Sequence, residues 1–273
     1  MTHARTSCVI KEKGGKPVFE WEPRLYLKYA DQRTQAAVDL ANRIIAENPQ
    51  KILDIGCGPG NSTHVLAQRF PNAYLLGIDN SPSMIEAARA DYPSYEFMLC
   101  DASKDLGMLG DDFDIVFSNA CIQWIPNHDQ LLKNMMKLLK NGGVLAVQLP
   151  DNSGEPIQRI LDEVSSRRIW APKIQLSQTF YNLKPNEYYD LLSEISSSFS
   201  IWQTIYFHTM KSHRDIIEWY SSTGLKPYLE PLSEEDRAAF TDDVHTELVK
   251  AYPAQKNGDV VLKFQRLFFI ATP

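Results

Sequence analysis

Short apolar runs alternate with amphipathic stretches in the first half of the chain. The runs predict strands, and the stretches between them predict helices. The strands are expected at 51–55, 73–79, 95–100, 113–118 and 144–149, and the helices at 61–69, 81–91 and about 128–140. Regular alternation of strands and helices predicts an α/β fold with a parallel sheet and right-handed crossovers.

Local signals mark two of the helix boundaries. Ser81-Pro82 offers a capping hydroxyl followed by proline in the first turn, which favours a helix start. Asn141-Gly142-Gly143 is expected to stop the helix that begins near residue 128.

The segment before the first strand divides in two. Residues 1–17 are polar and basic, and they are expected to form a flexible arm. From Glu20 the chain is expected to enter a helix that passes through Arg33 and ends near Pro49.

The second half of the chain departs from the alternating pattern. Residues 151–195 and 212–256 read as mainly helical, and 199–209 between them reads as a strand. Residues 260–271 form a last apolar strand. We therefore expect residues 18–273 to form a single domain with two helical insertions.

Composition limits the classes of function. The chain has 273 residues and a net charge of −6, so its overall charge does not favour nucleic acid or an anionic membrane. No apolar run approaches the length of a membrane span, and the N-terminus lacks a signal-peptide core. The four cysteines have no metal-ligand spacing, so no metal is expected. Three of them lie in or beside core strands, which is typical of reduced thiols and favours a cytosolic location.

A glycine turn follows the first strand and carries the strongest chemical signal. Residues 51–60 read Lys-Ile-Leu-Asp-Ile-Gly-Cys-Gly-Pro-Gly, with a helix expected directly afterwards. The next strand ends in Asp79, nineteen residues past Gly60, where an acid can accept hydrogen bonds from two ribose hydroxyls. Strand, glycine turn, helix and terminal acid together predict a site for a nucleoside cofactor. The alternative is that Gly-Pro-Gly is a tight turn without a role in binding.

The glycine spacing distinguishes between cofactors. A dinucleotide fingerprint has the spacing G-x-G-x-x-G, whereas here the turn closes one residue earlier. The pattern D-x-G-x-G-x-G from Asp54 to Gly60 resembles that of class I methyltransferases, which use S-adenosylmethionine. The resemblance implies a Rossmann-like fold with a seven-stranded, mostly parallel sheet, helices on both faces and a helical lid or insertion.

Ligands of such sheets bind beyond the carboxyl ends of the strands. We expect Asp54 to bind the cofactor's ammonium group, Asp101 the adenine amino group and the Ala102 amide the adenine ring. The alternative for Asp101 is a turn cap, and for Asn119 it is a plain turn residue. The full set of expected cofactor-binding residues is Asp54, Gly56, Gly58, Gly60, Asn61, Asp79, Asn80, Met84, Asp101, Ala102 and Asn119.

Several further stretches resemble one family. They begin at Tyr26 (Tyr-Leu-Lys-Tyr-Ala-Asp-Gln-Arg-Thr), Asn119 (Asn-Ala-Cys-Ile-Gln-Trp-Ile-Pro-Asn-His), Gly142 (Gly-Gly-Val-Leu-Ala-Val-Gln-Leu-Pro-Asp-Asn), Thr223 (Thr-Gly-Leu-Lys-Pro) and Phe264 (Phe-Gln-Arg-Leu-Phe-Phe-Ile-Ala). With the glycine loop, they are similar to the trans-aconitate 2-methyltransferase family. The resemblance runs from about residue 21 to the C-terminus. It implies methyl esterification of one carboxylate of a small tricarboxylate.

Such a reaction needs little catalytic machinery. A carboxylic acid with a pKa near about 4 is already ionised at neutral pH, so no general base is required. We therefore nominate no catalytic residue, and we expect His128 to be only a residue at a helix N-terminus. What remains is alignment and desolvation of the attacking oxygen.

An acidic substrate in an acidic protein needs local partners. Arg33 is the first choice because its planar fork matches a carboxylate, and its helix can fold over the cofactor as a lid. Gln148 ends a buried strand, where a ligand would explain a buried amide. The expected substrate-binding residues are Tyr26, Tyr29, Arg33, Trp124, Gln148 and Trp170. Minor candidates in the insertions are Arg168, Lys173, Tyr181 and Lys226.

Other functions are less well supported by the sequence. A methyltransferase for a hydroxyl or amine would need a base, and none is obvious beside Asn119. A nicotinamide-dependent dehydrogenase conflicts with the glycine spacing. A non-catalytic cofactor-binding protein would not need the insertions, and a nucleic-acid methyltransferase would need a basic face.

Overall fold

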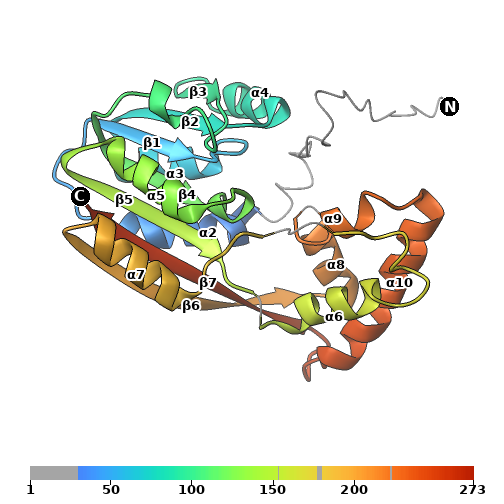
Figure 1. Cartoon of the computed structure of the whole chain (residues 1–273). Coiled ribbons are helices and arrows are strands. Elements are labelled where there is room, and N and C mark those ends of the chain that lie inside the picture. The colour runs from blue at the N-terminus through green and yellow to red at the C-terminus, as the bar shows by residue number, and fades with distance from the viewer. Residues whose placement is uncertain (1–29, 153, 177–179, 222) are drawn as a thin grey trace.

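The computed structural model describes residues 30–152, 154–176, 180–221 and 223–273, with side chains from residue 34 onward. Within them, one sheet has the strand order β3-β2-β1-β4-β5-β7-β6 (Figure 1). The strands are β1 (Lys51–Ile55), β2 (Tyr74–Asp79), β3 (Glu96–Leu99), β4 (Phe113–Asn119), β5 (Leu139–Pro150), β6 (Ser198–Met210) and β7 (Val260–Thr272). The first five strands pair in parallel, and β7 runs antiparallel to both β5 and β6. The expected seven-stranded, mostly parallel sheet is confirmed.

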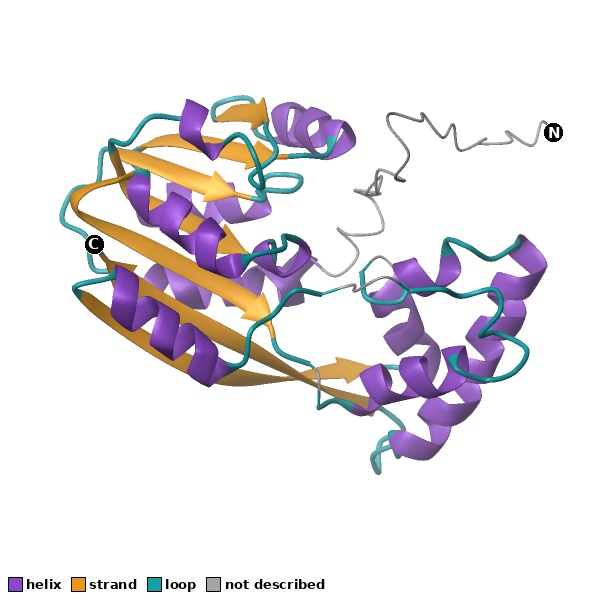
Figure 2. Cartoon of the chain, in the orientation of Figure 1, coloured by secondary structure: helices purple, strands orange, loops and turns teal. Residues whose placement is uncertain are grey.

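Helices cover both faces of this sheet (Figure 2). On one face α2 (Ala30–Arg43) and α3 (Asn61–Arg69) share an apolar core with β1 and β4. On the other face α5 (His128–Lys137) and α7 (Pro185–Ile195) form a second core with the same strands. Near the β3 edge, α4 (Pro82–Asp91) packs through Ile85 and Ala88. The described residues also form the short 3₁₀ turns η1 (Leu106–Met108) and η2 (Ile122–Trp124).

A separate helical layer lies beyond the far ends of β6 and β7 (Figure 1). It contains α6 (Pro156–Ser165), α8 (His213–Ser221), α9 (Lys226–Leu229) and α10 (Glu234–Ala251). These helices have an apolar cluster of their own, to which the ends of β6 and β7 contribute Met210 and Leu262. We call this layer the helical unit. The long antiparallel strands β6 and β7 therefore belong to both the sheet and the helical unit.

Several predicted boundaries need correction. Residues 166–184 of the first expected insertion contain no helix where they are described, and α7 packs on the sheet instead of in the helical unit. The N-terminal helix ends at Arg43, before the expected Pro49. The expected arm of residues 1–17 lies outside the described residues.

Asn141-Gly142-Gly143 does not stop a helix, because α5 already ends at Lys137 and these residues lie within β5. The pairing of β4 with β5 shifts here: Phe113 is opposite Leu139, whereas Ile115 is opposite Val144. The surplus residues form a bulge, in which Gly142 takes a φ of 77°. These glycines therefore serve an irregular strand and not a helix end.

Three cysteines fall in the described part of the chain, and Cys57, Cys100 and Cys121 are all free thiols. None of the helices in those same ranges combines the length and apolar character that crossing a membrane requires.

The packing of α2 and α3 on the sheet can be tested by substituting two phenylalanines. Phe268 on β7 is fully buried and stacks on Trp202 with ring centroids 5.2 Å apart, whereas Phe207 on β6 is 69% exposed. We expect Phe268→Ala to lower the free energy of unfolding by about 3–5 kcal/mol, because it leaves a cavity in the core. Phe207→Ala is the matched control, with an expected loss below about 1 kcal/mol. Urea unfolding of both variants measures the difference, and equal losses would contradict this packing.

Candidate active site

The glycine turn between β1 and α3 forms the centre of the site. Gly56 and Gly60 both have positive φ, and a side chain at either would collide with the protein: with Cys121 Sγ at 2.2 Å and with the Tyr92 ring at 2.6 Å. Gly58, with a φ of 54°, has nothing within 4 Å of the position of a Cβ. Two of the glycines are therefore required by packing, and only Gly58 leaves open space for a ligand.

Asp79 connects this turn to the end of β2. One carboxylate oxygen accepts the Gly58 amide at 3.0 Å, and the other accepts the Ser81 amide at 2.9 Å. Ser81 then caps α4 by accepting the Met84 amide, which confirms the predicted helix start. Burial raises the pKa of Asp79 above its usual value, while the backbone donors oppose that rise. The acid is held beside the open space at Gly58, and its contact with a ribose stays a prediction.

Asp54 is buried at the end of β1. Its Oδ2 accepts the hydroxyls of Ser62 at 2.6 Å and Thr63 at 2.7 Å, both in the first turn of α3. Its Oδ1 is buried without a hydrogen-bond partner among the described residues. Desolvation by burial raises the pKa of Asp54 to about 6. A buried carboxylate oxygen without a partner fits a ligand cation, such as the ammonium group of S-adenosylmethionine.

The other expected cofactor residues are distributed around these two acids. The Asp101 carboxylate accepts hydrogen bonds from the Ser103 amide, the Ser103 hydroxyl and the Lys104 ammonium, so it caps the turn that follows β3. Its contact with adenine, and that of Ala102, stay predictions. Met84 is buried at the start of α4, whereas Asn80 is exposed.

The end of β4 carries backbone strain. Asn119 and Asn61 each have a buried side-chain oxygen with no partner within the described ranges. Ala120 follows with a φ of 53°, which is unfavourable for any residue with a Cβ, and its amide donates to the Gln148 carbonyl at 2.9 Å. Strained residues of this kind cluster at functional sites.

Gln148 lies beside Asn119 in the register of β4 and β5, as expected from the strand ends. It is fully buried, and its Oε1 accepts a hydrogen bond from Arg266 Nη1 on β7 at 3.1 Å. Its Nε2 has no hydrogen-bond partner in the part of the chain that the structure describes. Sequence reasoning missed Arg266, although it lies in the Phe-Gln-Arg-Leu stretch near the C-terminus, one of the stretches that carries the family resemblance.

Trp124 ends the short turn that follows β4. Its ring packs on Phe180 with centroids 4.8 Å apart, and the adjacent Gln123 carbonyl accepts the Tyr181 amide at 2.9 Å. The segment near residue 180 therefore reaches back to the loop after Asn119. This position is compatible with the expected role of Trp124 as a wall of the pocket, which stays a prediction.

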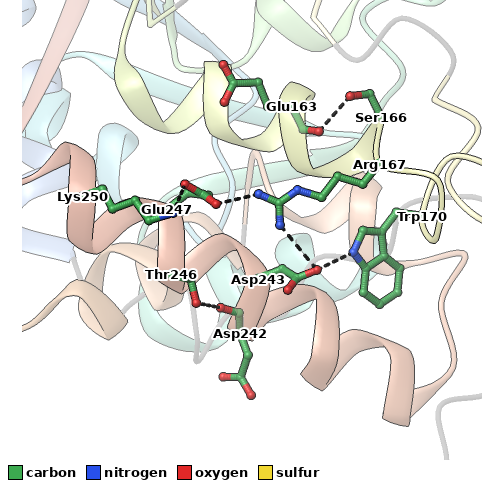
Figure 3. A network of polar contacts seen from close by, with 9 residues as sticks. All are labelled: Glu163, Ser166, Arg167, Trp170, Asp242, Asp243, Thr246, Glu247 and Lys250. Atoms are coloured by element: carbon green, nitrogen blue, oxygen red, sulfur yellow. Dashed lines mark hydrogen bonds and ion pairs between the residues drawn. The ribbon is translucent and has the colours of Figure 1, made fainter.

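Trp170 is placed differently from the expectation. It is 1% exposed within the core of the helical unit, and its indole donates to Asp243 at 2.8 Å (Figure 3). Arg167 joins the same network through Asp243 and Glu247. These contacts give Trp170 a structural role, and we leave it out of the pocket.

The minor cationic candidates have other partners or face solvent. Lys173 binds Asp236 at 2.7 Å, Lys226 lies 3.8 Å from Glu230, and Arg168 is exposed. Tyr26 and Tyr29 lie outside the described residues, as does the side chain of Arg33. The backbone of Arg33 belongs to the first turns of α2, the helix that packs on the face of the sheet bearing Phe268.

His128 begins α5, as expected, and both ring nitrogens have partners. Nδ1 lies 2.5 Å from the Tyr188 hydroxyl and Nε2 lies 2.9 Å from the Ile122 carbonyl. Burial lowers its pKa below the usual value. Within the described ranges, no three His, Cys, Asp or Glu side chains gather in a way that could hold a metal ion.

Comparison with known proteins identifies the family. Residues 47–212 match a family model described as a methyltransferase domain. A trans-aconitate 2-methyltransferase of an Enterobacter species is 41% identical over 252 residues, covering 92% of this chain and 98% of the relative.

Two solved structures show the same fold at low sequence identity. A putative methyltransferase of Bacillus halodurans aligns with a TM-score of 0.58 at 14% identity, over 87% of this chain and 98% of that one. A Haemonchus contortus phosphoethanolamine N-methyltransferase, solved with S-adenosylhomocysteine, aligns with a TM-score of 0.52 at 17% identity, over 88% of this chain and 53% of that one.

The role of Asp79 can be tested by cofactor affinity. Asp79→Ala removes a charged acceptor, and hydrogen bonds to charged groups are worth roughly 1.5–3 kcal/mol, so we expect S-adenosylhomocysteine to bind about tenfold more weakly or worse. Calorimetry measures the dissociation constant. The control is Asp111→Ala, which removes an exposed acid from the turn before β4. Unchanged affinity in a folded Asp79→Ala protein would remove Asp79 from the site.

The buried Asp54 predicts a pH dependence. Its pKa rises from 3.8 to about 6 on folding, so the folded state holds the extra proton between these values and stability falls as pH rises through them. Asp54→Asn keeps an acceptor for Ser62 and Thr63 but cannot ionise. Relative to wild type, its free energy of unfolding should rise by up to about 3 kcal/mol between pH 4 and pH 7. Denaturant unfolding of the ligand-free proteins at several pH values measures this, and parallel curves would refute the raised pKa.

Proposed function

Because the chain belongs to the trans-aconitate 2-methyltransferase family of S-adenosylmethionine-dependent methyltransferases, we propose that it esterifies a carboxylate of a small polycarboxylic acid, with trans-aconitate as the substrate. The observation that carries the proposal is the 41% identity over nearly the whole chain, which includes the helical unit as well as the cofactor loop. The buried amide nitrogen of Gln148, which has no hydrogen-bond partner among the described residues, supports an acceptor-rich substrate.

The chain's own residues position the reactants. S-adenosylmethionine supplies a methyl group that is already activated by a positively charged sulfur. Asp54 and Asp79 would hold its ammonium and ribose groups, and Gly58 leaves room for its methionine part. The substrate carboxylate is ionised at neutral pH, so the protein needs to remove water and align the oxygen with the methyl carbon.

The substrate pocket that we propose combines Gln148 and Trp124 with Arg33 from α2, and with Tyr26 and Tyr29, which precede that helix in the sequence. Gln148 and Trp124 come from the ends of β5 and of the loop after β4, next to the cofactor loop. Arg33 supplies a bidentate donor for a carboxylate. The cytoplasm is the compartment that we propose, in keeping with the three free thiols.

No base is needed for a carboxylate nucleophile, and this separates the proposal from methylation of a hydroxyl or an amine. His128 is unsuited to act as a base because both of its nitrogens already have partners.

The proposal is tested with labelled S-adenosylmethionine and a panel of small acids, alcohols and amines. We expect label to enter trans-aconitate as a base-labile methyl ester. The single-turnover rate should be nearly flat between about pH 6 and pH 8, because the nucleophile is ionised throughout.

Two outcomes would contradict the proposal. One is base-stable label in an alcohol or amine. The other is a single-turnover rate that climbs tenfold per pH unit, which would require a deprotonated hydroxyl or amine.

A further inference from the structure

One face of the sheet carries a row of buried side chains, and the proposed mechanism does not use in full its polar members, Gln148, Arg266 and His208. On β7 this face bears Phe264, Arg266 and Phe268, since alternate residues point the same way. Phe268 pairs with Gln148 on β5, and Phe264 pairs with Tyr206 on β6. The row therefore leads from the strand end beside Asn119 toward the helical unit, over about 13 Å of strand.

Arg266 fixes the orientation of the Gln148 amide. Arginine can only donate hydrogen bonds, so the atom that meets Nη1 at 3.1 Å must be the amide oxygen. The amide nitrogen of Gln148 is then turned away from Arg266, with two N–H donors and no acceptor among the described residues. A buried donor without a partner costs about 1–3 kcal/mol, and a ligand acceptor that binds these N–H groups would remove that cost.

The other end of the row also contains a buried donor without a partner among the described residues. Tyr220 on α8 packs on Phe264 with ring centroids 6.3 Å apart, and the Arg266 guanidinium lies 4.7 Å from the centre of the same ring. The Tyr220 hydroxyl is buried and has no hydrogen-bond partner in the described ranges. Burial raises the pKa of Tyr220 well above its usual value, so this hydroxyl keeps its proton and is a donor.

Charge in the row comes from Arg266. The ring centroids of His208 and Phe264 lie 6.0 Å apart. The buried Nε2 of His208 has no hydrogen-bond partner in the described chain. Burial and the nearby Arg266 charge lower the pKa of His208 to about 4, so it is neutral at pH 7. Glu155, whose charge acts on Tyr220, is itself paired with Lys263 at 3.1 Å. The neutral donors Gln148 and Tyr220 beside the buried Arg266 cation suit a ligand with carboxylate oxygens.

We infer that Arg266 and Tyr220 bind a substrate carboxylate that is not methylated, between β7 and α8, while the free N–H groups of the Gln148 amide bind an acceptor of the same substrate at the other end of the row. This inference rests on the proposed function and deepens it, because donors spread along the row fit an acid with carboxylates at both ends. A monocarboxylate can occupy only one end. Arg266 and Tyr220 are then specificity residues that select polycarboxylates.

The test uses Tyr220→Phe, which deletes only the unpartnered hydroxyl. In the ligand-free protein this change should leave thermal stability unchanged or raise it, because no hydrogen bond is lost. With S-adenosylhomocysteine bound, the dissociation constant for trans-aconitate should rise about tenfold in calorimetry. The affinity for crotonate, an unsaturated monocarboxylate, should not change. A merely structural tyrosine would not combine preserved stability with weaker binding of the polycarboxylate alone.

Tyr228→Phe is the matched control within the same helical unit. Its hydroxyl donates to Asp162 at 2.9 Å, so the change should lower stability and leave trans-aconitate affinity at the wild-type value. Arg266→Lys keeps the charge but loses the fork that holds the Gln148 amide, and we expect a larger rise in the dissociation constant than for Tyr220→Phe.

The outcomes separate the two proposals. If wild-type protein methylates trans-aconitate while Tyr220→Phe keeps wild-type affinity, only the site between β7 and α8 is overturned. The same holds if Tyr220→Phe weakens crotonate as much as trans-aconitate. If wild-type protein neither binds nor methylates any di- or tricarboxylate, the proposed function falls, and this inference falls with it.

Discussion

The site depends on the hydrogen bonds that a buried carboxylate at the end of β1 accepts from α3. Asp54 receives two hydroxyls from the first turn of α3, and this joins the central strand of the sheet to the helix that follows the glycine turn. Burying a charge is unfavourable unless it is satisfied, and here one of the two oxygens remains without a partner among the described residues. A ligand cation beside this oxygen would give it the partner that the described residues do not supply. A cofactor ammonium group would supply that cation and lower the pKa of Asp54 again.

The turn around this acid shows two different uses of glycine. Gly56 and Gly60 are needed because Cys121 and Tyr92 occupy the positions of their missing side chains, whereas Gly58 faces open space. The tight packing of the first two keeps the third in place, with its amide bound to Asp79. The packing of Gly56 and Gly60 thus fixes the position of the Gly58 backbone beside open space. At the end of the neighbouring strand β4, Ala120 also has a positive φ, although it carries a Cβ.

The helical unit depends on the sheet through two long strands. Both β6 and β7 extend past the other strands and contribute apolar residues to the core of the helical unit. A ligand between β7 and α8 would therefore touch elements of both parts. Because each part has its own apolar core, their junction can carry polar groups without loss of either core. This is where Arg266, His208 and Tyr220 lie.

The sequence by itself determined the features that depend on neighbouring residues. The period of apolar residues predicted the strands from β1 to β4 within one or two residues, and Ser81-Pro82 predicted the start of α4. The glycine spacing and the strand-terminal Asp79 predicted the cofactor loop, because a turn and the acid after it are coded locally. The sequence resemblance added the family, which the comparisons confirmed.

Tertiary structure decided the features that join distant segments. The glycines at 142 and 143 resemble a helix stop locally, but the bulged pairing with β4 places them within a strand. Trp170 resembles a pocket aromatic until Asp243, far along the chain, accepts its indole N–H. Arg266 lies 118 residues from Gln148, and no local pattern connects them. Apolar periodicity reports whether a residue is buried, but the partner of a buried polar group is set only when the strands assemble.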